Sequence, residues 1–252
     1  MQATHPRVVA VIPARYASTR FPAKPLALIA GKPMIQRVVE QVQQVHGVHQ
    51  ILVATDDARI RDCVQSFGAT AVMTSPYHPT GTDRIAEAVR DVEADIILNV
   101  QGDEPLIPPA PLDALLAHMH AHPAAAMGTI ARPLALDDPD LANPNVVKVV
   151  RDAAGFALYF SRALIPHARS VRPPAAQPLH HWGVYAYRRE FLYQFIAWPQ
   201  GVLESCEQLE QLRALEHGAR IFVMVANVTS IGVDIPDDVA KVEAQLRAQE
   251  TP

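Results

Sequence analysis

Cysteine and long apolar stretches are both scarce in this sequence. Its two cysteines, Cys63 and Cys206, lie far apart in segments with a helical pattern, and neither belongs to a C-x-x-C pair. A disulfide framework is therefore not expected, and ordinary thiols in a reducing compartment are. No apolar run approaches the roughly 20 residues that a membrane-spanning helix needs, and the polar residues 1–7 contain no apolar signal region. We therefore expect a cytoplasmic protein with no membrane partner.

Charged residues are also few, at 19% of 252 residues, against 49% hydrophobic residues. This balance is typical of a globular protein with a sizeable core rather than of a disordered one. The formal net charge of -4 gives no electrostatic reason to expect nucleic-acid binding. Neither G-x-x-x-x-G-K-[ST] nor G-x-G-x-x-G follows the first predicted strand, so neither a P-loop NTPase nor a dinucleotide-binding Rossmann domain is predicted.

Apolar runs alternate with amphipathic helical patterns over the first hundred residues. Strands are predicted at residues 8–12, 50–54, 71–73 and 95–100. Helices are predicted to open at residues 32–33 and to cover residues 57–67 and 82–92. Such an alternation favours an α/β fold with a doubly wound, mostly parallel sheet and helices on both of its faces.

The middle of the chain has a different pattern. Alternating strands are predicted at residues 145–151, 156–160 and 183–188, with a proline-rich connector at 171–178. We therefore expect one domain, residues 1–252, with a small antiparallel β insertion at about 143–190. This insertion is expected to act as a lid or as the surface of a homodimer. A helix at about 205–216, a strand at 221–226 and a final helix after residue 238 are predicted to complete the chain.

The loop after the first strand carries three cations, Arg15, Arg20 and Lys24, separated by proline and small residues. Ligands of α/β sheets bind at the carboxyl ends of strands, and arginine and lysine suit the oxygens of a polyphosphate. A solvated basic loop is the alternative. The position directly after a buried strand favours a phosphate site.

Two carboxylates are candidates for binding Mg²⁺. Asp103 follows the strand at 95–100 and stands beside Gly102, which lets a ligand approach. Asp234 lies shortly before the final helix, whose amino terminus Asp237 and Asp238 are better placed to cap. A simple turn at Asp103 and a helix cap at Asp234 are the alternatives. Two such carboxylates would suit a displacement at phosphorus assisted by two metal ions.

Residues 12–26 resemble the amino-terminal motif of the 3-deoxy-manno-octulosonate (Kdo) cytidylyltransferases, also called CMP-Kdo synthetases. Residues 101–105 and 232–234 resemble the motifs whose aspartates bind metal in that family, and further matches extend the resemblance from about residue 8 to residue 242. The resemblance implies a nucleotide-diphospho-sugar transferase-like fold and Mg²⁺ bound by Asp103 and Asp234. One departure is Ala23, where the family usually has glycine, which costs backbone freedom.

The resemblance also implies which side chains handle the substrates. Those implied to bind the nucleotide are Ala14, Arg15, Ser18, Arg20, Lys24, Thr55, Asp56, Thr82 and Arg84. Those implied to bind the sugar are Gln101, Arg162, His181, Tyr185, Glu210 and Gln211. Kdo has a carboxylate and several hydroxyls, so it needs a fixed cation and a cluster of polar groups. A solvated helix face is the alternative for Glu210 and Gln211.

The function implied is the transfer of CMP from CTP to the C2 hydroxyl of Kdo, giving CMP-Kdo and pyrophosphate for lipopolysaccharide biosynthesis. Lys24, Asp103 and Asp234 would be the catalytic residues. One alternative is a cytidylyltransferase for another acid sugar, such as an amino analogue of Kdo or a sialic acid. A non-catalytic sugar-nucleotide-binding protein is a second alternative, which the presence of all three catalytic candidates disfavours.

Overall fold

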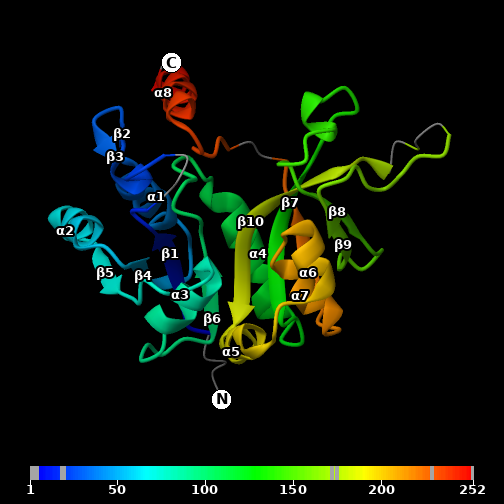
Figure 1. Ribbon diagram of the computed structural model, residues 1–252, viewed down its shortest axis with the longest axis horizontal. Coiled ribbons are helices and arrows are strands. Elements are labelled where there is room, and N and C mark those ends of the chain that lie inside the picture. The colour runs from blue at the N-terminus through cyan, green and yellow to red at the C-terminus, as the bar shows by residue number, and fades with distance from the viewer. Residues whose placement is uncertain (1–5, 18–20, 171–172, 174–175, 228–229, 251–252) are drawn as a thin grey trace. The chain divides into compact units, whose positions relative to one another are not determined.

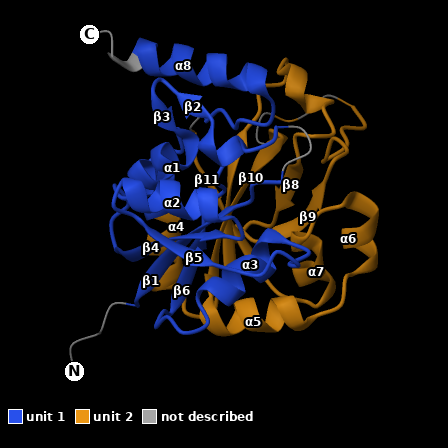
Figure 2. Cartoon of the chain, turned by 60° about the vertical axis from the view of Figure 1, so that its left-hand side comes forward, with its two compact units in different colours: residues 1–113, 230–252 blue, residues 114–229 orange. Residues whose placement is uncertain are grey.

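The computed structural model describes residues 6–17, 21–170, 173, 176–227 and 230–250 of the chain (Figure 1). The chain forms two compact units, coloured separately in Figure 2. Unit 1 comprises residues 1–113 and 230–252, and unit 2 comprises residues 114–229. None of the helices in the described ranges combines the length and the apolar character that a membrane span requires.

Unit 1 contains four parallel strands in the order β6-β1-β4-β5. They are β1 (Val8–Ala14), β4 (Val48–Thr55), β5 (Thr70–Met73) and β6 (Ile96–Asn99). Because β1 has neighbours on both edges and residues 8–12 have no exposed surface, its sequence is a continuous apolar run rather than an alternating one. Ala14 pairs with Thr55 at the carboxyl ends of β1 and β4, so the loops that follow these strands start side by side.

Among the described residues of unit 1, four helices lie wholly within the unit, together with a short helical turn and a two-stranded ribbon. They are α1 (Met34–Val42), α2 (Ala58–Ser66), α3 (Gly81–Ala88) and α8 (Pro236–Glu250), with η1 (Lys24–Leu26), β2 (Leu28–Ile29) and β3 (Lys32–Pro33). The helix predicted to open at residues 32–33 begins at Met34 instead. Lys32 and Pro33 are held in an extended conformation because they pair with β2.

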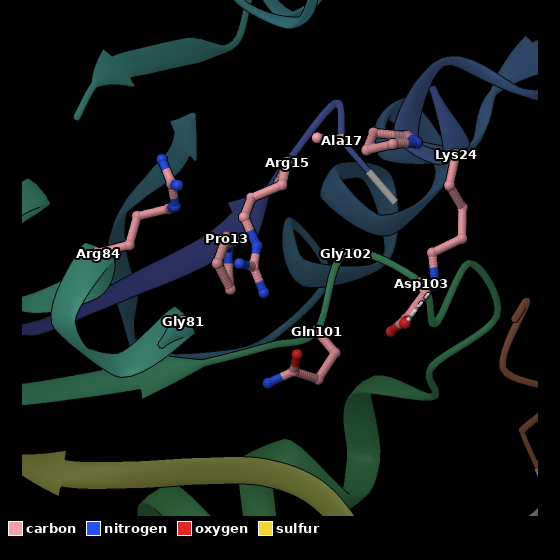
Figure 3. A pocket seen from close by; sticks show the side chains of 11 residues that line it. Pro13, Arg15, Ala17, Lys24, Gly81, Arg84, Gln101, Gly102 and Asp103 are labelled. Carbon is pink, nitrogen blue, oxygen red and sulfur yellow. Dashed lines mark hydrogen bonds and ion pairs between the residues drawn. The ribbon is translucent and has the colours of Figure 1, made fainter. Parts of the chain in front are cut away.

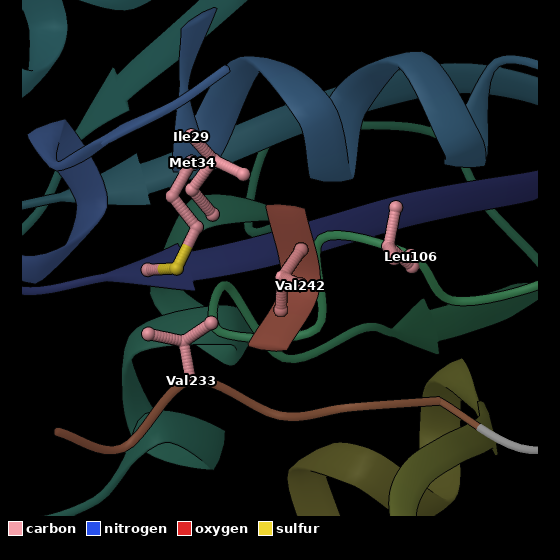
Figure 4. Close-up of a cluster of buried hydrophobic side chains, with 5 residues drawn as sticks. All are labelled: Ile29, Met34, Leu106, Val233 and Val242. Atoms are coloured by element: carbon pink, nitrogen blue, oxygen red, sulfur yellow. The ribbon is translucent and has the colours of Figure 1, made fainter. Parts of the chain in front are cut away.

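A cluster of buried apolar side chains packs the start of α8 and the segment before it against the rest of unit 1 (Figure 4). Its members are Ile29, Met34, Leu106, Val233 and Val242. They come from β2, α1, the segment after β6, the segment before α8, and α8 itself. This packing holds Val233 in place, and it therefore holds the next residue, Asp234, near the segment after β6.

The antiparallel strands of the larger sheet belong to unit 2. They are β7 (Met127–Pro133), β8 (Lys148–Arg151), β9 (Ala157–Ser161) and β10 (Leu179–Arg188), and β11 (Ile221–Val225) runs parallel to β7. The helical segments are η2 (Pro139–Leu141), α5 (Arg189–Ala197), α6 (Val202–Glu207) and α7 (Gln211–Glu216), and α4 (Pro109–Ala121) spans the point where the chain enters this unit. The predicted α/β class with a small antiparallel region is confirmed.

The prediction of a single helix at about 205–216 is wrong. Gln208 adopts a left-handed conformation (φ 54°, ψ 47°) and separates α6 from α7. The break leaves backbone carbonyls free to accept other hydrogen bonds. The Arg162 guanidinium takes them, with Nε 2.7 Å from the oxygen of Glu207 and Nη2 3.2 Å from that of Gln208. A side chain far away in the sequence thus stabilises the interruption.

Candidate active site

A pocket in unit 1 lies at the carboxyl end of β1 (Figure 3). Its volume is about 380 Å³, within the range of roughly 300–1,000 Å³ that small-molecule sites occupy. Six of the predicted site residues surround it, namely Ala14, Arg15, Lys24, Arg84, Gln101 and Asp103. Ser18 and Arg20, which the sequence also predicts to bind the nucleotide, lie outside the described residues.

The turn after β6 approaches β1 so closely that residue 102 has no room for a side chain. A Cβ atom on Gly102 would lie 2.9 Å from the carbonyl oxygen of Pro13, which is a clash with backbone. Glycine at this position therefore allows the turn to place Gln101 and Asp103 beside the end of β1.

Residues 15–24, here called the cation loop, are closed at their base by a backbone hydrogen bond. The amide of Ala23 donates to the carbonyl oxygen of Tyr16 at 3.0 Å, and Ala23 has a φ of 57°. This is the left-handed region, in which a Cβ costs about 1 kcal/mol relative to glycine. Arg15 directly precedes Tyr16 and Lys24 directly follows Ala23, so this hydrogen bond brings the two ends of the loop, with their cations, together.

Lys24 brings the two aspartates predicted to bind metal to one place. Its ammonium nitrogen lies 2.7 Å from Oδ2 of Asp103 and 3.6 Å from Oδ1 of Asp234. Lys24 is mostly buried, whereas Asp103 and Asp234 are partly exposed, and Lys24 and Asp103 both line the pocket. Two carboxylates that approach the same ammonium also have the spacing to approach the same small cation.

This donor set fits Mg²⁺, which prefers oxygen ligands and is typically held by one or two carboxylates together with substrate phosphates. In the described part of the chain no group of three or more histidine, cysteine, aspartate or glutamate side chains is arranged to hold a metal. At a site of this kind, water and the phosphate oxygens of a substrate would supply the remaining ligands. The adjacent cation loop is suited to bind such a substrate.

Glu104 fastens the segment that carries Asp234, a role that the sequence reasoning missed. The hydroxyl of Ser230 donates to Oε2 of Glu104 at 2.6 Å. The amide of Val233 donates to the carbonyl oxygen of Asp103 at 2.9 Å. Burial, together with the neighbouring Asp103 and Asp234 charges, raises the pKa of Glu104 to about 7. The only sequence signal was a second carboxylate directly after Asp103.

The final helix begins earlier than the sequence predicted. Because α8 starts at Pro236, Asp237 and Asp238 lie in its first turn rather than before it. Asp238 folds back on the segment before the helix, where its Oδ2 accepts hydrogen bonds from the amides of Asp234 and Ile235 at 3.0 and 3.1 Å. The ammonium of Lys241 lies 2.7 Å from its other oxygen. Asp238 therefore fixes the backbone of Asp234.

Arg84 forms a rigid wall of the pocket. It is almost completely buried, and it donates to the hydroxyl of Thr74 at 2.6 Å and to Oδ2 of Asp56 at 2.8 Å. Asp56 directly follows β4, so the carboxyl end of the sheet orients Arg84. Thr55 and Thr82 are the other predicted nucleotide-binding residues, and both are buried. Thr55 ends β4, directly before Asp56, and Thr82 is in the first turn of α3, two residues before Arg84.

The predicted sugar-binding residues other than Gln101 belong to unit 2. His181 and Tyr185 lie on β10, where Nε2 of His181 is 2.9 Å from the hydroxyl of Thr129. That hydroxyl donates to the carbonyl oxygen of Val184 at 2.7 Å, so it accepts from His181, and Nε2 carries the proton. Burial lowers the pKa of His181 to about 3. His181 is therefore neutral near pH 7, with Nδ1 as an acceptor.

Glu210 and Gln211 stand at the start of α7, and Glu210 lies near Tyr185. Burial raises the pKa of Tyr185 and the charge of Glu210 raises it further, so the phenol keeps its proton. Gln211 is 4% exposed, and its amide nitrogen has no hydrogen-bond partner among the described residues. A buried donor without a partner is costly, and a hydroxylated ligand could satisfy it. This observation disfavours the alternative of a solvated helix face.

Arg162 uses its guanidinium on backbone carbonyls. Besides the bonds to residues 207 and 208, Nη1 donates to the oxygen of Pro144 at 2.9 Å. Lys148, which the sequence reasoning missed, is fully buried and donates to the oxygens of Asn143 and Val146 at 2.9 and 2.6 Å. Both cations therefore fix the segment before β8. Contact between Arg162 and a sugar carboxylate, which stays a prediction, requires an exchange of these bonds.

The parallel sheet of unit 1 and a pocket with arginine, lysine and carboxylate side chains at its carboxyl edge define the class of nucleotidyltransferases. In agreement, the profile of the family described as Cytidylyltransferase matches residues 9–221. A solved structure of CMP:2-keto-3-deoxy-manno-octonic acid synthetase complexed with CTP superposes with a TM-score of 0.91 and 44% identity, covering 96% of this chain and 99% of the other.

Curated relatives narrow the class. The 3-deoxy-manno-octulosonate cytidylyltransferase of Syntrophotalea carbinolica is 51% identical over 247 residues, covering 95% of this chain and 98% of the relative. The enzyme of the same name from Myxococcus xanthus is 52% identical, covering 96% and 98%. The chain belongs to the 3-deoxy-manno-octulosonate cytidylyltransferase family, which confirms the resemblance of its motifs.

Proposed function

We propose that the protein transfers CMP from CTP to the C2 hydroxyl of Kdo. The oxygen of that hydroxyl forms a bond to the α-phosphorus, the bond between this phosphorus and the bridging oxygen breaks, and pyrophosphate leaves. The hydroxyl proton passes to solvent or to a base. The observation that carries this proposal is the convergence of Lys24, Asp103 and Asp234 beside a pocket lined by Arg15 and Arg84.

The residues of unit 1 would bind the triphosphate and set its position. Arg15 can fork onto phosphate oxygens and Lys24 adds a point charge. Gly102 keeps the turn close to the end of β1, which lets backbone groups approach the nucleotide. Catalysis would then consist of positioning and of electrostatic stabilisation of the charge that develops on the phosphates.

Mg²⁺ is proposed as the cofactor, with Asp103 and Asp234 as its protein ligands. When bound, it would neutralise phosphate charge and make the sugar hydroxyl a better nucleophile. Lys24 would exchange the aspartates for phosphate oxygens. Glu104 would keep the segment of Asp234 in place through Ser230.

The residues of unit 2 supply polar groups suited to a hydroxylated acid sugar. Neutral His181 offers an acceptor at Nδ1, the phenol of Tyr185 can donate, and the amide of Gln211 offers a buried donor. Glu210 would accept from hydroxyls. Arg162 and Gln101 complete the proposed set.

Pyrophosphate release by purified protein with CTP, Mg²⁺ and Kdo tests this function, beside parallel reactions with UTP and with a sialic acid. Release that requires both CTP and Kdo supports the full proposal. Release with CTP and only another acid sugar would contradict the sugar assignment and retain the nucleotide chemistry. No release with any pair, from folded protein, would contradict both.

We also propose a cytoplasmic homodimer that serves lipopolysaccharide biosynthesis. Cys63 and Cys206 are free thiols, which suits a reducing compartment. Among the described strands β9 pairs with β8 alone, and Leu158 on it is 63% exposed, so this edge could pair across a dimer. The insertion at about 143–190 stays predicted as a lid or dimer surface. Light scattering after size exclusion would test the dimer, and a monomer would contradict it.

A further inference from the structure

Arg59 lies over the base of the cation loop although it belongs to a different element. Its guanidinium carbon is 3.3 Å from the ring centroid of Tyr16. Tyr16 stands between Arg15 and Ala17, which both line the pocket, but it does not line the pocket itself. Arg59 is in the first turn of α2. Arg59 does not line the pocket either, so this contact is suited to position the loop rather than to bind a ligand.

Asp57 fixes the plane of this guanidinium. Its carboxylate accepts from Nε of Arg59 at 2.9 Å and from Nη2 at 2.6 Å. The same carboxylate caps α2 by accepting from the backbone amide of Arg59 at 2.9 Å. Arginine can make such a bidentate pair and present its flat face to an aromatic ring at the same time, whereas lysine cannot. The position of the guanidinium is therefore determined by the amino terminus of α2.

Tyr16 connects this support to two of the three cations of the loop, Arg15 and Lys24. Its carbonyl oxygen accepts the hydrogen bond from Ala23 that closes the cation loop. Arg15 precedes Tyr16 directly, and Lys24 follows Ala23 directly. Holding Tyr16 therefore sets the position of both cations before any phosphate arrives. Asp56, next to Asp57, orients Arg84 in the same way, so one turn after β4 supports two sides of the pocket.

We propose that Arg59 is a positioning residue for triphosphate binding, which acts by stacking on Tyr16 and never touches the nucleotide. This inference rests on the proposed function, because it assumes that the cation loop binds the triphosphate of CTP. It predicts a loss of CTP affinity with little change in the turnover number at saturating CTP or in the KM for Kdo. A loss of general folding stability alone would not produce that separation.

Calorimetric titration of the full-length protein with CTP and Mg²⁺ tests the proposal. We expect Arg59→Ala to raise the Kd of CTP about fivefold, the upper end of the range for a cation–π contact at an exposed site, because 59% of the Arg59 side chain is exposed. Tyr16→Leu removes the aromatic face and should give a similar loss, while Tyr16→Phe keeps the face and should bind within about twofold of the original protein. Both substitutions remove the same contact. The double variant Arg59→Ala, Tyr16→Leu should therefore bind CTP no more weakly than either single variant.

Two results would overturn the proposal. One is normal CTP affinity in Tyr16→Leu together with a loss in Arg59→Ala, which would make Arg59 a direct phosphate ligand. The other is a combined loss near the product of the single losses. Circular dichroism of each variant checks folding, and Arg59→Lys, expected to keep the charge and lose most of the affinity, provides a second variant.

Hydrogen exchange of the Ala23 amide in nucleotide-free protein tests the contact without any substrate. Exchange should be faster in Arg59→Ala and unchanged in Tyr16→Phe, since the amide is held by the oxygen of Tyr16. Equal exchange in Arg59→Ala and the original protein would contradict the positioning role. If the original protein fails to bind CTP while the exchange differs as expected, the proposed function fails and the contact stands.

Discussion

Replacing Lys24 with methionine removes a positive charge that Asp103 and Asp234 share. The ammonium lies 2.7 Å and 3.6 Å from these carboxylates. Unit charges about 4 Å apart interact by roughly 1 kcal/mol in water and by about 4 kcal/mol at an effective dielectric constant near 20. The two aspartates are 34% and 54% exposed, so the lower half of this range applies, about 1–2 kcal/mol for each pair.

A divalent cation held by these carboxylates must take the place of the ammonium. In nucleotide-free protein we therefore expect Lys24→Met to bind Mn²⁺ at least ~10-fold more tightly, since about 1.4 kcal/mol, the loss of only one of the two pairs, corresponds to tenfold. The same variant should lose at least ~10²-fold in turnover, because a charge that stabilises the reacting phosphates is gone. Metal affinity and activity thus move in opposite directions.

Electron paramagnetic resonance of free Mn²⁺ measures the affinity directly. Lys32→Met is a matched control, since it removes the same charge from a lysine that pairs with Glu40 at 2.8 Å. Weaker or unchanged Mn²⁺ binding in Lys24→Met, beside an unchanged control, would refute the electrostatic reasoning.

Three further changes test other parts of the account. Asp103→Asn should keep the fold and lose at least ~10²-fold in turnover; near-normal turnover in a steady-state assay would remove Asp103 from the mechanism. Ala23→Gly should raise the free energy of unfolding by about 1 kcal/mol, because it relieves a φ of 57°. The control Ala27→Gly, at a φ of -58°, should lower the free energy of unfolding. Urea denaturation measures both changes, and equal changes in the two variants would contradict backbone strain at Ala23. The pKa of His181 is about 3 in the folded protein against 6.5 in the unfolded chain. Its contribution to stability is therefore complete above pH 6.5 and lost as the pH falls towards 3, by about 2 kcal/mol at pH 5. Between pH 7 and pH 5 the His181→Gln variant should lose correspondingly less free energy of unfolding than the original protein. Parallel curves of unfolding free energy against pH for the two proteins would show that His181 titrates normally.

The local patterns of unit 1 allowed much of the fold and pocket to be predicted. The apolar run at residues 8–12 indicated both the central strand and the site at its end, because a buried strand and the loop after it are encoded by neighbouring residues. The strand is longer than predicted, since it continues through Pro13 to Ala14. Gly102 beside Asp103 likewise indicated a close approach, and the structure places its Cα near the carbonyl oxygen of Pro13.

Features that depend on distant residues could not be predicted. The interruption at Gln208 depends on Arg162, 46 residues earlier. The helical periodicity of residues 205–216 gives no sign of this interruption. The role of Glu104 depends on Ser230, 126 residues later. The contact of Arg59 with Tyr16 joins the first turn of α2 to the loop after β1, and these become neighbours only when β4 pairs with β1. In each case tertiary contacts decide what an otherwise ordinary polar side chain does.

The central claim is that one nucleotidyl group passes from CTP to the C2 hydroxyl of Kdo. Phosphorus NMR of a reaction containing the protein, CTP, Mg²⁺ and Kdo tests it most directly, because it resolves the sugar phosphodiester from CMP and from pyrophosphate. The account predicts equal amounts of phosphodiester and pyrophosphate, both dependent on Kdo. Formation of free CMP without phosphodiester, or an unchanged CTP spectrum, would contradict it.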